Sequence, residues 1–97
     1  MDRLLYLSSL YELYKGLCTE KQRLYFEDYY YNNLSLSEIA ENYNISRNAI
    51  HSQIKIVESR LEEFESILDL EKKKNKILKL LDGKVEAEII DKIENLL

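Results

Sequence analysis

Six side chains of the types that read nucleic-acid grooves occur within ten consecutive residues of this 97-residue sequence. They are Ser46, Arg47, Asn48, His51, Ser52 and Lys55. An arginine can chelate guanine, an asparagine can chelate adenine, and a lysine can meet a phosphate. If the segment is helical, this spacing places the six on its outward side. The set predicts a nucleic-acid-binding surface that carries only two firm positive charges.

The residues around this set fit the pattern of a helix-turn-helix motif. Two helices that cross closely need a small residue at the contact, and Ala40 supplies one. Asn44 stands at the turn, where asparagine tolerates left-handed backbone angles, and Ser46 is typical of an N-cap. The apolar positions that would flank the crossing are Ile39, Tyr43, Ile45, Ile50 and Ile54. A plain helical corner is the alternative interpretation.

Helix signals divide the rest of the chain. Apolar spacings of three and four predict a helix over residues 2–15, with Gly16 following it at positive φ. Capping boxes predict helices over 20–31, with Leu24 buried, and from 36 to about 42. A heptad-like seam then predicts the longest helix, through Ile50, Ile54, Val57, Leu61, Phe64 and Leu68.

Composition limits the fold class and the partners. The chain has no proline and two glycines, so we predict an all-α fold. Its net charge of −4 excludes a general electrostatic affinity for nucleic acid. Residues 1–60 contain 7 lysines and arginines and 8 aspartates and glutamates. Residues 61–97 contain 7 lysines and arginines and 10 aspartates and glutamates. Any contact with DNA or RNA therefore belongs to the first part, and protein partners are the stronger expectation.

We predict two parts, a helix-turn-helix domain over residues 1–70 that includes the long recognition helix, and a C-terminal helical extension over residues 71–97. The lysine-rich run at 72–76 is interpreted as a solvated helix face or a weak joint, and Asp69 with Lys73 at i,i+4 favours a helix. A charged exposed turn is preferred over a binding patch. Gly83 is the expected break before the last helix. Because the seam continues beyond Leu61, we expect the extension to support a homodimer, which would also pair the recognition helices.

Other chemistries find little support, and we predict no catalytic residue, cofactor or metal. His51 has no titratable neighbour that the sequence guarantees, so it is expected to face solvent. Cys18 is expected to be a half-buried, inert thiol. The Gly83-Lys84 pair lacks the first glycine of a P-loop. The single cysteine and the absence of a long apolar run favour a cytoplasmic protein without membrane insertion.

The sequence also resembles a known family, the small bacterial YlxM-type proteins, whose fold is similar to region 4 of sigma factors. The resemblance covers roughly residues 1–70. It is carried, in order, by Thr19-Glu20-Lys21-Gln22-Arg23, Tyr29-Tyr30, Ser35-Leu36-Ser37-Glu38-Ile39-Ala40-Glu41, Ser46-Arg47 and Ile54-Lys55. Where this family often has a basic residue after Lys55, the chain has Ile56, which removes a potential phosphate contact.

The resemblance implies an all-helical, non-enzymatic protein encoded beside the signal recognition particle GTPase. It further implies a regulatory or accessory part in protein targeting, with signal recognition particle protein or RNA as partner. A sequence-specific DNA-binding transcriptional regulator is the alternative function, because the helix-turn-helix surface could bind DNA directly.

Overall fold

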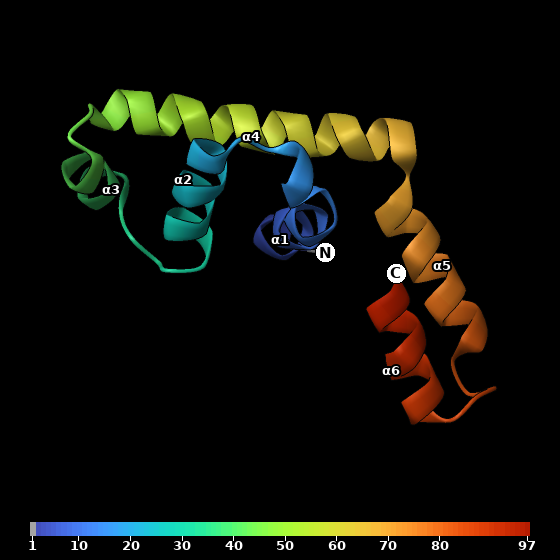
Figure 1. Cartoon of the computed structure of the whole chain (residues 1–97). Helices are drawn as coiled ribbons and strands as arrows, with labels where there is room; N and C mark the ends of the chain where they lie inside the picture. Colours follow the sequence, from blue (N-terminus) through green and yellow to red (C-terminus); the bar gives the residue numbers. More distant parts are fainter. Residues whose placement is uncertain (1) are drawn as a thin grey trace.

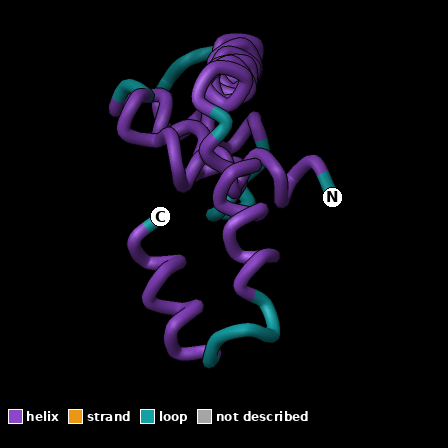
Figure 2. Tube along the Cα trace, turned by 90° about the vertical axis from the view of Figure 1, so that its right-hand side faces the viewer, coloured by secondary structure: helices purple, strands orange, loops and turns teal. Residues whose placement is uncertain are grey.

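The computed structural model describes residues 2–97, and all secondary structure in that range is helical (Figure 2). The elements are α1 (Arg3–Tyr14), the 3-10 turn η1 (Lys15–Leu17), α2 (Glu20–Tyr30), α3 (Leu36–Tyr43), α4 (Arg47–Leu68), α5 (Leu70–Leu81) and α6 (Ala87–Leu96). The prediction of an all-α fold is confirmed.

The 22-residue helix α4 is the axis of the molecule (Figure 1). Helices α1, α2 and α3 all pack against it, along one side. At its far end the chain turns sharply into α5, and α5 and α6 form a hairpin that projects away from the other helices. The molecule is consequently elongated, with principal extents of 52 × 26 × 23 Å.

Two apolar clusters hold α1, α2 and α3 on α4. The first joins α1, α2 and the middle of α4 and consists of Leu10, Tyr11, Tyr14, Cys18, Phe26, Val57 and Leu61. The second joins α2, α3 and the beginning of α4 and consists of Tyr25, Ile39, Ala40, Ile50 and Ile54. Tyr30 packs against both clusters, and its ring stacks on Phe26 with centroids 4.3 Å apart. The early part of α4 is thus fixed rigidly to the helices before it.

Local capping signals work as predicted. The capping boxes at Thr19 and Ser35 are both formed, and each starts its helix at the expected residue. Asn44 adopts left-handed angles at the end of α3, with φ 55° and ψ 44°. Ser46 caps α4, because its hydroxyl accepts a hydrogen bond from the Ala49 N–H at 3.0 Å.

Two expectations for the first helices are wrong. Gly16 lies inside the 3-10 turn and does not have positive φ; the turn closes when the Cys18 N–H donates to the Lys15 carbonyl. Leu24 is exposed. The inward face of α2 includes Tyr25 and Phe26, and Leu24 lies about 100° around the helix from Tyr25.

The interpretation of the lysine run as a turn is also wrong. The break falls earlier, at Asp69, which has φ 59°, and α5 begins at the next residue and contains the lysines. Leu68, the last residue of the predicted seam, is exposed beside this break. Gly83 has φ 72° and does separate the last two helices, as predicted. None of the helices described is long and apolar enough to cross a membrane.

Candidate helix-turn-helix interface

Helix α3, the turn after it and the first turns of α4 form the crossing that the sequence pattern predicts. Ala40 and Ile39 of α3 are buried at the contact with Ile50 and Ile54 of α4. The Ile45 N–H donates to the Ala40 carbonyl at 3.0 Å, which closes the turn behind the left-handed asparagine. The beginning of α4 is therefore held at a fixed angle to α3.

All six residues of the predicted surface are exposed at the beginning of α4. Ser46 already has a structural use, because its hydroxyl caps α4. Arg47 follows directly and has no carboxylate within 4.0 Å among residues 2–97. Asn48, His51 and Ser52 make no side-chain hydrogen bond within the same range. A partner could therefore bind Arg47, Asn48, His51 and Ser52 without breaking a side-chain hydrogen bond or ion pair.

Lys55 differs from the other five because its charge is shared. Its ammonium lies 3.3 Å from Oε1 of Glu58, a carboxylate that is only 6% exposed. The other oxygen of Glu58 accepts a hydrogen bond from the Tyr30 hydroxyl. Burial, followed by this contact with Glu58, raises the pKa of Tyr30. The Glu58 carboxylate thus ties Lys55 to the core and weakens its attraction for a phosphate.

The surface also contains residues that the search for groove-reading types missed. Ile45, which was expected to flank the crossing, is 38% exposed in the turn, and Ile56 on α4 is 42% exposed. Glu38 and Glu41 are exposed on α3, which has no basic residue. Their spacing of three, out of phase with Ile39, is the sequence signal that could have identified them. The exposed surface thus combines two bases, two carboxylates and two isoleucines.

A shallow cleft of about 430 Å³ lies near the start of α3. Its lining consists of Leu4, Tyr29, Tyr30, Asn33, Leu34, Ser35 and Glu38. The Glu38 carboxylate accepts a hydrogen bond from the Ser35 N–H as part of the capping box, which lowers its pKa. The cleft therefore presents aromatic and apolar surface, with its one carboxylate already used to hold α3.

The remaining titratable candidates, Cys18 and His51, differ in their exposure. Cys18 is only 5% exposed, and burial raises the pKa of its thiol, which opposes thiolate chemistry. His51 is exposed on α4, far along the chain from that thiol. Within residues 2–97 no three histidine, cysteine, aspartate or glutamate side chains are grouped to hold a metal ion.

The crossing of α3 and α4, the capped turn and the exposed start of α4 define a helix-turn-helix protein. A family model described as "helix-turn-helix protein, YlxM / p13 like" matches residues 1–96. The chain therefore belongs to this family, also named UPF0122, as the resemblance in its sequence predicted.

Individual relatives agree. A UPF0122 protein of Halalkalibacterium halodurans is 41% identical over 87 residues, which cover 90% of this chain and 80% of the relative. One from Bacillus licheniformis is 44% identical over 95 residues, covering 90% of this chain and 89% of the relative. One from Shouchella clausii is 40% identical over 107 residues, covering 99% and 98% of the two chains.

Proposed function

We propose that this protein is a non-enzymatic accessory factor of the signal recognition particle pathway, and that its helix-turn-helix surface docks onto a protein component. The charge balance of that surface carries the proposal. Arg47 and Lys55 are opposed by Glu38 and Glu41, and Lys55 is additionally paired with Glu58. The resemblance to YlxM-type proteins selects the signal recognition particle GTPase as the first partner to test.

Docking onto the DNA backbone would place this surface in an unfavourable field. In helix-turn-helix complexes the first helix crosses the phosphates while the second enters the groove. Here α3 would bring Glu38 and Glu41 toward those phosphates, and it has no basic residue to offset their repulsion. Two exposed isoleucines, Ile45 and Ile56, would instead gain from burial against a protein surface.

The test is a calorimetric titration of the chain with the purified signal recognition particle GTPase, and separately with the particle's RNA. We expect binding to the GTPase, weakened about tenfold or more by Ile56→Asp or Arg47→Ala. Arg60→Ala is the matched control, because Arg60 is exposed on the same helix outside the motif, and it should change the affinity less than twofold. An absence of binding to the GTPase at about 50 μM, or binding to the RNA alone, would contradict docking onto protein.

One observation favours a second candidate, a regulator that reads DNA. Arg47, Asn48 and His51 project from the beginning of a capped helix, where the helix dipole adds positive potential. Such a reader should lose affinity steeply as salt rises, and Arg47→Ala should weaken its binding. If a low-salt titration with genomic fragments gives no sequence preference, this candidate is rejected.

A further inference from the structure

The hairpin of α5 and α6 has an incomplete core. No residue of α6 is buried, and the one buried residue of α5 is Glu71. Leu78, Leu81, Ile90 and Ile93 are half-buried between the two helices. Other apolar side chains are left open to solvent, namely Ile77 at 39%, Leu80 at 67%, Ile89 at 44% and Leu96 at 86% exposed.

The open side chains adjoin the half-buried ones. Ile77 and Leu80 are three residues apart and share one side of α5, while Ile89 and Leu96 are seven apart and share one side of α6. Each pair lies next to the half-buried residues of its own helix. The hairpin consequently presents a continuous apolar face that covers both helices and that no part of residues 2–97 buries.

We propose that this face binds the same face of a second copy of the chain, so that two hairpins form a four-helix bundle with α5 of one copy against α6 of the other. This inference goes beyond the proposed function and does not depend on it. A second copy fits because a two-fold interface is self-complementary, and it offers an equal apolar face to cover this one.

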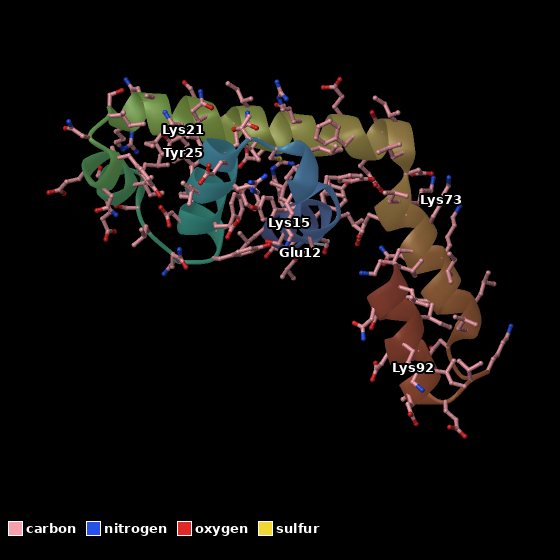
Figure 3. All side chains as sticks on the ribbon, in the orientation of Figure 1. Glu12, Lys15, Lys21, Tyr25, Lys73 and Lys92 are labelled. Atoms are coloured by element: carbon pink, nitrogen blue, oxygen red, sulfur yellow. The ribbon has the colours of Figure 1, made fainter. Side chains whose placement is uncertain are left out.

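Charge selects between the two ways of stacking the hairpins. Helix α5 has five lysines and one glutamate, a net charge of +4. Helix α6 has Glu88, Asp91 and Glu94 against Lys92, a net charge of −2, and Lys92 lies 3.5 Å from Glu88. Stacking α5 on its own copy would place two helices of net charge +4 side by side, whereas stacking α5 on the second copy's α6 places helices of opposite net charge side by side. Lys73 on α5 and Lys92 on α6 both project into solvent in the single chain (Figure 3).

The favoured stacking fixes the symmetry of the dimer. Since α5 and α6 are antiparallel, α5 meets the second copy's α6 only when the two-fold axis runs parallel to the helices. Both α5 helices then begin at the same end of the bundle. The two copies of α4 are attached at that end (Figure 1), so both helix-turn-helix surfaces lie on the same end of the assembly.

Light scattering on the full chain after gel filtration tests the interface. We expect a dimer of the 11.6 kDa chain, and Leu80→Glu or Ile89→Glu should raise its dissociation constant about tenfold or more. Leu17→Glu is the matched control, because Leu17 is 55% exposed but lies outside the hairpin. All three positions are exposed in the single chain, so circular dichroism should report unchanged helix content. A monomer at about 100 μM, or a dimer that survives both hairpin substitutions, would overturn the proposal.

Disulfide cross-linking tests which helices meet. Leu80 precedes the end of α5 by one residue and Ile89 follows the start of α6 by two, so they lie at the same level of an antiparallel hairpin. A mixture of Leu80→Cys chains with Ile89→Cys chains should give mixed cross-linked dimers more readily than either variant alone. Cys18 is buried and does not compete. A dimer in which the mixed cross-link does not form would contradict the pairing of α5 with the second copy's α6.

Discussion

The Tyr14 hydroxyl donates a hydrogen bond to the Glu65 carboxylate at 2.6 Å and joins α1 to the last turn of α4. The same hydroxyl accepts from the Leu70 N–H at 3.2 Å. The Glu65 carboxylate also accepts from the N–H groups of Glu71 and Lys72 at 3.0 and 3.1 Å. These are orphan donors in the first turn of α5, whose own N-cap makes no side-chain bond. The pair therefore fixes the joint between the helix-turn-helix body and the hairpin.

Removing the hydroxyl should destabilise the whole chain. Tyr14→Phe leaves a buried carboxylate without its O–H donor and the Leu70 N–H without its acceptor, a loss of about 1–3 kcal/mol in the free energy of unfolding. Urea unfolding followed by circular dichroism measures it. The control is Tyr29→Phe, whose hydroxyl makes no hydrogen bond within residues 2–97 and whose loss should change stability by less than about 0.5 kcal/mol. Equal effects of the two substitutions would show that the joint contributes nothing.

Neutralising Glu65 should loosen α5 locally. In Glu65→Gln one carboxylate oxygen is replaced by an amide N–H₂ group, which donates and does not accept. The two oxygens that accept from the Glu71 and Lys72 N–H groups are therefore reduced to one. We expect hydrogen exchange at the Glu71 and Lys72 amides to accelerate, while amides in the middle of α4 change little. Glu63→Gln, two residues away and exposed, is the control. Uniform acceleration along the whole chain would instead indicate global destabilisation.

Alkaline pH should weaken the fold through four tyrosines whose pKa is raised in the folded chain. Burial, and then the contact with Glu65, raises the pKa of Tyr14 from 10.0 to about 12, and burial also raises the pKa of Tyr11, Tyr30 and Tyr31. Because the unfolded chain loses these protons first, the stabilisation is complete below pH 10 and is lost as the pH rises toward 12. The urea midpoint should be level from pH 8 to 9.5 and then fall. A midpoint that stays level up to pH 11.5 would contradict these contacts.

The turn of the motif should tolerate few residues at position 44. Asn44 has left-handed backbone angles, which cost a residue with a Cβ roughly 1–2 kcal/mol unless, like asparagine, it can hydrogen-bond locally. Asn44→Gly should therefore be close to neutral, Asn44→Ala should destabilise by about 1 kcal/mol, and Asn44→Val by more. Thermal unfolding of the three variants gives the ranking. Equal stability of the glycine and valine variants would show that the turn is not held in this conformation.

Local signals in the sequence predicted most of the helix starts, because a cap depends on residues three positions apart. Thr19, Ser35 and Ser46 all cap the helices assigned to them. Such local signals do not predict contacts between residues that are far apart in the sequence. The pairing of Tyr14 with Glu65 spans 51 positions, and it stabilises the start of α5, where the sequence left a helix and a turn both open.

The candidate surface was predicted in the same uneven way. Its six polar residues are exposed, since the pattern of buried isoleucines determined which side of α4 faces out. Spacing could predict only part of the electrostatics of the surface. Lys55 and Glu58 are three residues apart on one helix, but spacing does not show that Glu58 is buried. The ion pair of Lys55 depends on Glu58, which Tyr30 of α2 holds in the core, and the carboxylates of α3 reach the surface only through the crossing.

The most direct test of the docking surface is the map of chemical-shift changes when the purified signal recognition particle GTPase is added to the isotope-labelled chain. If the helix-turn-helix surface docks onto this protein, the amides of Ile45, Arg47, His51 and Ile56 should shift together, while those of α6 stay unchanged. No shift in this group at saturating GTPase, with the same amides shifting only when duplex DNA is added, would contradict the docking function and favour a DNA reader.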